Sequence, residues 1–353
     1  MRHVIRSGSI PFAVACVLGC ALPASASDGD GQRVTLTTGD GAELAARYFV
    51  GNLGGKSPAV LVLDDVGEES RPKACDALAK KLAAEGCTVL CFDYRGHGRS
   101  TAVTPEFWDD TTNRQFVRGF KSGAPPEAIA VADFRAGYLP TLLNDVAAAR
   151  AYLEGRNDVG ECNTGQVFVV GFGGGATLGQ LWVVSEWSRF RATGFQSKLA
   201  SAPEGRGVAG CVWVAPRFAL DRQAVPMFDL VKKAEQKKSL FVGIVHGPDD
   251  AATVRFAKQC KLAFNPRSGN GLIVSESVSE SDTPPAARSE TTAVIERLIG
   301  SMRKRNDPPP WDDRDFPDRR YVWAFPGSPL ELAKDEGELQ FRPLPVNRLL
   351  GGR

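Results

Sequence analysis

The sequence reads Gln166-Val167-Phe168-Val169-Val170-Gly171-Phe172-Gly173-Gly174-Gly175 at the point that decides the fold. The apolar start of this stretch, rich in β-branched and aromatic residues, predicts a buried strand over 166–170. The glycine cluster ends the strand, and the apolar spacing that follows predicts a helix over 177–190. A strand that turns directly into a helix is half of a β-α-β unit, so this stretch indicates a parallel sheet covered by helices.

Strands and helices alternate on both sides of this turn. A Gly-Asp-Gly connection at 39–41 predicts an antiparallel hairpin at the front of the domain. Residues 101–137 show no clear period and are predicted to be an inserted loop region at the functional edge of the sheet. The further predicted strands are 59–63, 88–92, 208–215, 240–245 and 271–275, and the further predicted helices are 72–85, 139–155, 227–237, 252–264 and 290–304. This order predicts one α/β domain over 27–304 with a doubly wound, mostly parallel sheet.

The two ends of the chain differ from this domain. Arg2 and Arg6, an apolar stretch and the small residues Ala24-Ser25-Ala26 predict a signal peptide over 1–26, hence export to the periplasm or the medium. A second processing route stays open, because Val17-Leu18-Gly19-Cys20 resembles a lipobox that would attach a lipid anchor at Cys20. Residues 305–353 are rich in proline and are predicted to be a tail that drapes over the domain or docks a partner.

Composition excludes several classes of function. Without residues 1–26 the chain has 41 basic residues (43 less the two arginines) and 41 acidic residues, so nothing favours nucleic-acid binding. No other stretch is long and apolar enough for a membrane span. The six cysteines of the mature chain, whose pairing the sequence does not decide, are Cys75, Cys87, Cys91, Cys162, Cys211 and Cys260. With no C-x-x-C pair and only two histidines, neither a metal site nor a cofactor is predicted.

The glycines at 171–175 permit a rival interpretation. Gly171-x-Gly173-x-x-Ala176 matches the glycine fingerprint of dinucleotide-binding folds, between a strand and a helix as that fingerprint requires. However, it comes after at least two earlier parallel strands, and no acidic residue ends the next strand, which closes Ala215-Pro216-Arg217. Glycine also suits a strained turn simply because it adopts positive φ without steric cost. Nucleotide binding therefore stays the weaker alternative.

Three segments resemble the α/β-hydrolase superfamily, in particular exported bacterial members with a glycine-rich nucleophile elbow. Asp93-Tyr94-Arg95-Gly96-His97-Gly98-Arg99-Ser100 is similar to the D-x-R-G-x-G-x-S turn of that family. Val170 to Gly175 stands at the G-x-S-x-G elbow, and Val245-His246-Gly247-Pro248-Asp249-Asp250 resembles the segment that carries the acid. The resemblance implies an α/β-hydrolase fold over about 32–300, and a serine, a histidine and an acid as the catalytic groups.

Position by position, the implied machinery is incomplete. Gly173 stands at the nucleophile position, Asp250 at the acid position with Asp249 as an alternative, and no histidine follows His246. We expect both His97 and His246 to be structural. The implied oxyanion donors are the backbone N–H groups of Val66 and Gly174. The nearby acids Asp64, Asp65, Glu68 and Glu69 would oppose an oxyanion there, and are predicted to be either a solvated loop or part of a cation or polar-ligand site.

The leading hypothesis is a non-catalytic α/β-hydrolase-fold protein, an extracytoplasmic binding or scaffold module for a small molecule or a protein. The alternative is a hydrolase that acts on an ester or related substrate through unorthodox acids, with Asp65, Asp249, Asp250 or Glu276 activating water. The binding edge is expected around Val66, Gly173, Asp250 and the 101–137 region, with a second surface in the tail around Trp311 and Trp323.

Overall fold

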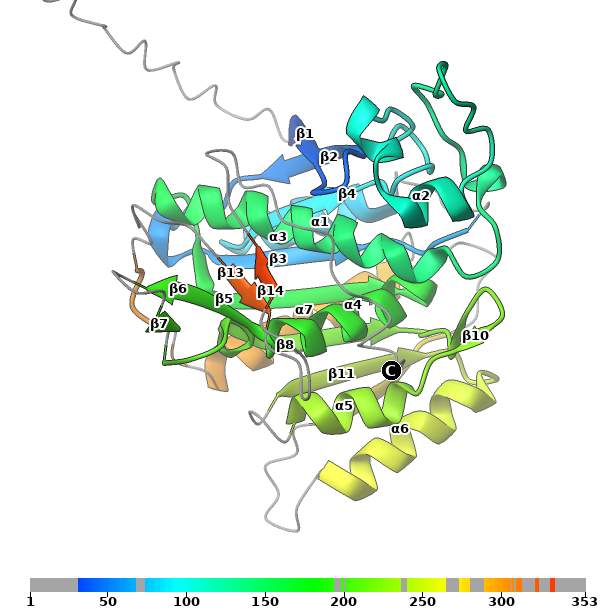
Figure 1. Cartoon of the computed structure of the whole chain (residues 1–353). Helices are drawn as coiled ribbons and strands as arrows, with labels where there is room; N and C mark the ends of the chain where they lie inside the picture. Colours follow the sequence, from blue (N-terminus) through cyan, green and yellow to red (C-terminus); the bar gives the residue numbers. More distant parts are fainter. Residues whose placement is uncertain are drawn as a thin grey trace, which may run out of the picture.

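The protein folds around one large sheet (Figure 1). The computed structural model describes residues 31–67, 74–193, 198–199, 201–235, 240–264, 273–279, 289–305, 307, 309–312, 321–323 and 331–333. The predicted signal peptide with Cys20, the acids Glu68 and Glu69, and most of the predicted tail lie outside these residues.

The large sheet has the strand order β1-β2-β4-β3-β5-β8-β11-β12. β1 and β2 form the predicted antiparallel hairpin, β2 runs antiparallel to β4, and the other neighbours are parallel. The strands are β1 Gln32–Thr37, β2 Glu43–Phe49, β3 Pro58–Leu63, β4 Thr88–Phe92, β5 Asn163–Phe172, β8 Val208–Val214, β11 Phe241–His246 and β12 Ile273–Ser277. The predicted α/β class is confirmed, with a doubly wound, mostly parallel sheet and an N-terminal antiparallel hairpin.

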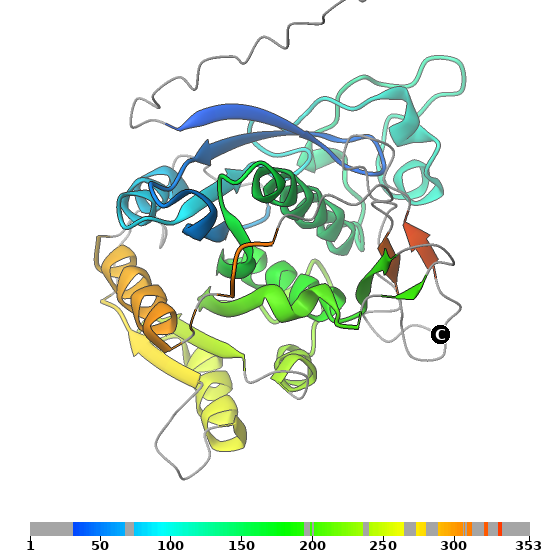
Figure 2. The same ribbon diagram turned by 90° about the vertical axis from the view of Figure 1, so that its left-hand side faces the viewer.

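Helices cover both faces of the sheet (Figure 2). α1 and α7 pack on one face, and α3, α4, α5 and α6 pack on the other. The helices are α1 Ala74–Ala84, α3 Leu143–Asp158, α4 Gly173–Glu186, α5 Met227–Glu235, α6 Ala251–Phe264 and α7 Ser289–Arg305. Among the described residues no helix has the length and apolar character that a membrane crossing needs.

The central strands are apolar at every position because helices cover both faces of the sheet. In β3, Leu61 and Leu63 point to the α3 and α4 side, while Val60 and Val62 point to the α1 and α7 side, and none of the four is exposed to solvent. A strand buried on both faces has no polar positions to alternate with, which explains why periodicity alone does not separate its two faces.

The inserted region 101–137 is folded onto the end of the sheet by buried polar groups. It contains α2 (Thr111–Phe116) and short 3-10 turns at Pro105–Trp108 and Val131–Asp133. Asn113 Nδ2 donates to Asp40 Oδ2 at 3.1 Å, and Arg95 binds Asp40 and Asp145 with its guanidinium at 2.8 and 2.6 Å. Phe107 and Trp108 of this region are buried in the core.

A second sheet, in the order β14-β13-β6-β7, lies beside α4. Its strands are β6 Arg189–Thr193, β7 Lys198–Leu199, β13 Tyr321–Trp323 and β14 Glu331–Ala333, and a two-stranded pair joins β9 Ala219–Leu220 to β10 Gln223–Ala224. The predicted helix over 177–190 therefore extends too far, because α4 ends at Glu186 and residues 189–191 are extended and pair with β13. The pairing partner comes from the tail, more than 120 residues further along the chain, where a local pattern could not reveal it.

Candidate functional site

The glycine cluster forms a tight turn between β5 and α4. Phe172 still has the extended backbone of the strand, with φ −113° and ψ 134°, and α4 begins at the next residue. Gly173 has φ +53°, in the left-handed region. The chain thus turns sharply from strand to helix at Gly173, and glycine adopts the left-handed backbone there at little cost.

The loop that follows β3 packs directly onto this turn. β3 and β5 are neighbours in the sheet, so the carboxyl end of β3 delivers Asp64 and Asp65 to the elbow. A Cβ atom on Gly175 would lie 2.1 Å from the Asp64 carbonyl oxygen. A Cβ atom on Gly173 would lie 2.5 Å from both Cγ and Oδ1 of Asp65. A carboxylate therefore occupies the place where a nucleophilic side chain would begin.

The Asp65 carboxylate is held by the two N–H groups that the sequence predicts as oxyanion donors. Oδ1 accepts from Val66 N at 2.8 Å and from Gly174 N at 2.7 Å. Oδ2 pairs with Arg217 Nη2 at 2.5 Å. The sequence predicts that Asp65 lies beside this donor pair. In the structure its carboxylate lies between the two donors, because the side chain turns back over the N–H group of Val66 toward the start of α4.

Arg217 is the residue of this site that sequence reasoning missed. Its backbone N donates to Gly173 O at 3.1 Å, its Nη1 donates to Val66 O at 3.1 Å, and its carbonyl accepts from Thr177 Oγ1. It follows β8, which lies next to β5 in the sheet, and Ala215 turns the chain there with φ +45°. The sequence feature that could have indicated Arg217 is its position just after the predicted strand 208–215. The residues that follow neighbouring parallel strands lie at the same edge of the sheet.

Charge at the site is balanced. The side chain of Asp65 is 35% exposed and that of Arg217 is 52% exposed, so water reaches both partners. The start of α4 adds the partial positive charge of a helix N-terminus, which favours an anion at this place. The arrangement is a carboxylate seated among two N–H donors, a guanidinium and a helix start.

Two neighbours fix the loop that carries Asp65. Asp64 Oδ1 accepts from Asp65 N at 2.8 Å, and burial raises the pKa of Asp64 to about 6. His97 Nε2 accepts from Gly67 N at 2.9 Å, so its Nδ1 must carry the proton that is shared with Arg95 O at 2.8 Å. Burial lowers the pKa of His97, which favours this neutral form. Both ring nitrogens thus serve the loop and its supporting turn.

The residues at the acid segment have other partners. Asp250 Oδ1 accepts from Thr253 N at 3.0 Å and caps the start of α6, while Asp249 is exposed. His246 Nδ1 lies 2.9 Å from Gly247 O. Glu276 of β12 pairs with Arg297 of α7 at 3.1 Å. None of the described contacts joins these groups to Gly173 or to Asp65.

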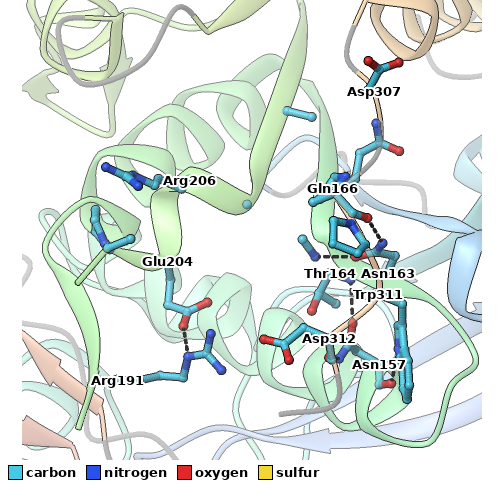
Figure 3. Close-up of a pocket in the computed structure, with 17 residues that line it drawn as sticks. Asn157, Asn163, Thr164, Gln166, Arg191, Glu204, Arg206, Asp307, Trp311 and Asp312 are labelled. Atoms are coloured by element: carbon cyan, nitrogen blue, oxygen red, sulfur yellow. Dashed lines mark hydrogen bonds and ion pairs between the residues drawn. The ribbon is translucent and has the colours of Figure 1, made fainter. Parts of the chain in front are cut away.

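The cavities in the described part of the chain include two that contact strands of the sheet at different places. One cavity, of about 470 Å³, lies beside β2, β4 and α1. Its lining includes Arg47, Asp64, Cys75, Cys91, Asp93 and Arg99. The other, of about 640 Å³, lies at the opposite edge, where β5 begins at Asn163, and is bordered by Trp311 and by the Arg191–Glu204 ion pair (Figure 3). All six cysteines of the described residues are buried and reduced. Among the described residues no group of three or more His, Cys, Asp or Glu could hold a metal ion.

Comparisons with known proteins give short or distant similarities. No family model matches the chain. Two uncharacterised proteins of Mycobacterium tuberculosis strains CDC 1551 and H37Rv are 41% identical over 68 residues, which are 19% of this chain. The match spans about a quarter (24%) of the length of those relatives.

Solved structures similar to this chain include α/β hydrolases and esterases. An α/β serine hydrolase without a lid from Xanthomonas campestris is 12% identical, with a TM-score of 0.44 over 80% of this chain and 97% of that one. An esterase of Pyrococcus furiosus is 14% identical, with a TM-score of 0.47 over 78% and 89%. A hypothetical protein of Pseudomonas aeruginosa is 12% identical, with a TM-score of 0.48 over 77% and 92%.

Proposed function

We propose that the chain is a non-catalytic α/β-hydrolase-fold protein that works as a binding or scaffold module in an extracytoplasmic compartment. The observation that carries the proposal is the Asp65 carboxylate, which stands where the nucleophile of a serine hydrolase would begin and accepts from both oxyanion donors. The glycine at 173 and the occupied donors belong to one arrangement, because a side chain on Gly173 and the present position of Asp65 exclude each other.

The occupied donors argue against acyl transfer. Ester hydrolysis by this fold needs N–H groups that receive the negative oxygen of a tetrahedral intermediate. Here the N–H groups of Val66 and Gly174 already share one carboxylate oxygen. A second negative oxygen at the same place would be repelled by Asp65 and would lack donors. This supports a site that cannot stabilise the transition state of the reaction.

The other groups at the edge support the same conclusion. A general base must reach the proton that it removes within a hydrogen bond or one water. His97 uses both ring nitrogens to hold its own loop and turn. Of the acids in the hydrolase alternative, Asp250 caps a helix and Glu276 pairs with an arginine, so neither is held over the elbow by a described contact.

Nucleotide binding at the glycine turn is also disfavoured. The N–H group of Gly174 is the kind of donor that would hold a phosphate at a helix start. It donates to Asp65 at 2.7 Å, and the carboxylate would face the incoming phosphate charge. A thermal melt of the protein with NAD and NADP tests this alternative, and we expect no change in melting temperature.

The test of the proposed function is chemical labelling with a turnover assay. The full chain, recovered after export from a bacterial host, is incubated with a fluorophosphonate probe for serine hydrolases and with a panel of p-nitrophenyl esters. We expect no labelling, and ester turnover that stays linear in substrate and equals that of an unrelated protein at the same concentration. Saturable turnover that is lost in Asp65→Asn or in Asp250→Asn would establish the hydrolase alternative instead.

The extracytoplasmic part of the proposal rests on residues 1–26 and has its own test. Intact-mass measurement on fractionated cells is expected to find the chain outside the cytoplasm and starting at Ser27. If the measured chain instead starts at a lipidated Cys20, the exported protein is anchored to a membrane and is not released. An uncleaved chain in the cytoplasm would contradict export.

A further inference from the structure

The contacts around Asp65 have the form of a ligand site. Three donors from three separate segments meet on one carboxylate: Val66 N after β3, Gly174 N at the start of α4, and Arg217 Nη2 after β8. We propose that these donors form a binding site for carboxylate-bearing ligands and that Asp65 is its built-in occupant. The inference rests on the proposed function, since a free donor pair would otherwise serve catalysis.

The geometry matches what a free carboxylate requires. One oxygen receives two backbone N–H groups at 2.7 and 2.8 Å, and the other receives the guanidinium at 2.5 Å. Hydrogen bonds to an ionised acceptor are roughly twice as strong as neutral ones, and guanidinium pairs with carboxylate more specifically than ammonium does. Arg217 is itself held by Gly173 O and Val66 O, so the cation is fixed before any ligand arrives.

The site also has the space and the access that a ligand needs. Gly173 contributes no side chain, and its φ of +53° discourages every other residue type there. Asp65 is 35% exposed and Arg217 is 52% exposed, so the pair lies at the surface of the edge rather than in the core. If the methylene and carboxylate of Asp65 were removed, the vacated volume would be that of acetate.

Asp65 is a strong competitor because it is tethered. A group on the same chain acts at an effective concentration that reaches the millimolar range or above, and a free monocarboxylate must exceed this. A natural ligand must therefore displace the Asp65 carboxylate from these donors, and to do so it would combine a carboxylate with further contacts along the edge. The wild-type protein is expected to ignore acetate, and a variant without the Asp65 carboxylate is expected to bind it.

The experiment is a chemical rescue measured by thermal melting. We expect the protein with Asp65→Gly, which removes both the methylene and the carboxylate, to melt roughly 2–6 °C below the wild type, because three donors lose their acceptor. Sodium acetate at up to about 200 mM should recover at least half of that loss, while sodium chloride at the same ionic strength should not. Saturation-transfer NMR should show acetate on this variant and not on the wild type.

Three matched variants separate site binding from general salt effects. Asp65→Asn keeps an oxygen for the two N–H groups and should melt near the wild type without an acetate response. Asp65→Gly with Arg217→Met should lose the rescue, since the cation is gone. Asp109→Ala, which removes an exposed aspartate elsewhere, should leave both the melting temperature and the acetate response of the wild type unchanged.

The proposal is overturned if the variant without the carboxylate melts cooperatively and acetate raises its melting temperature no more than that of the wild type. Asp65→Ala, which vacates only the carboxylate, is the second variant should Asp65→Gly not fold, and the same comparison applies to it with sodium formate in place of sodium acetate. The outcome is independent of the esterase test. Failure of rescue with no ester turnover removes only the carboxylate site, whereas ester turnover with a fluorophosphonate label removes the proposed function.

Discussion

Restoring a side chain at the elbow gives the sharpest test of the arrangement around Gly173. In Gly173→Ser the new Cβ atom would lie 2.5 Å from the Asp65 carboxylate. The serine would also have to adopt the backbone φ of +53° that Gly173 has. The left-handed backbone costs a non-glycine residue about 1–2 kcal/mol. Pushing Asp65 aside leaves two N–H groups without their acceptor, which costs about 1–2 kcal/mol more, a value reduced because water reaches the site. We expect a total loss of about 2–4 kcal/mol in the free energy of unfolding.

A double-mutant cycle with Asp65→Ala isolates the clash. In the double variant the carboxylate is already absent, so the serine adds only its backbone strain. The double variant should therefore be about 1–2 kcal/mol more stable than the sum of the two single losses. The assay is urea unfolding followed by tryptophan fluorescence, with equal slopes required across the four proteins.

A second comparison separates the strain from the clash. Gly123 also has positive φ, at +86°, but a Cβ atom there would meet nothing within 4 Å. Gly123→Ala thus reports backbone strain alone, and Gly173→Ala should cost clearly more. Our placement of Asp65 would be refuted if the two alanine variants cost the same and the cycle were additive within about 0.5 kcal/mol. Neither variant at 173 should gain esterase activity, since the serine would have no histidine partner.

Further predictions concern the loop, the insert and the second sheet. Burial raises the pKa of Asp64 from 3.8 to about 6. The protonated carboxyl therefore contributes fully to stability below pH 3.8, and this contribution, at most about 3 kcal/mol, is lost as the pH rises through about 6. Asp64→Asn should flatten this pH dependence, as measured by urea titrations at pH 4 and 7.5. Asn113→Ala removes the donor to buried Asp40 and should cost about 1–3 kcal/mol, with faster proteolysis within 101–137. Arg189→Met leaves two buried glutamates of α3 and α4 without this cation and should cost about 3–5 kcal/mol, measured as a lower melting temperature.

The α/β architecture could be read from the sequence because it depends on local patterns. Apolar runs such as 59–63 and 166–170 have few alternatives to a strand that is buried on both faces, and the helices between them have a clear period. The end of α4 was misjudged because residues 187–190 have no strong breaker, and their extended form depends on β13 from a distant part of the chain. Local propensity gives way where a remote partner supplies the hydrogen bonds.

At the candidate site, too, some features follow from the local sequence and others depend on remote partners. The glycines at 171–175, the absence of a histidine after His246, and the backbone N–H groups of Val66 and Gly174 follow from positions along the chain. The place of Asp65 does not, because an acid after β3 could equally point into water, and its actual direction depends on donors from β5–α4 and on Arg217. Arg217 itself lies more than 40 residues beyond Gly173 in sequence and reaches it only because β8 is next to β5.

The sequence by itself determined that this is a doubly wound α/β chain in which the glycines at 171–175 stand between a strand and a helix. Those are properties of residue type and spacing, which act within a few residues through backbone sterics and hydrophobic periodicity. Only the tertiary structure decided what the elbow holds. Three strands end at the same edge of one sheet, and the groups that follow them satisfy one another there, so the donors that the elbow presents have an acceptor from within the chain.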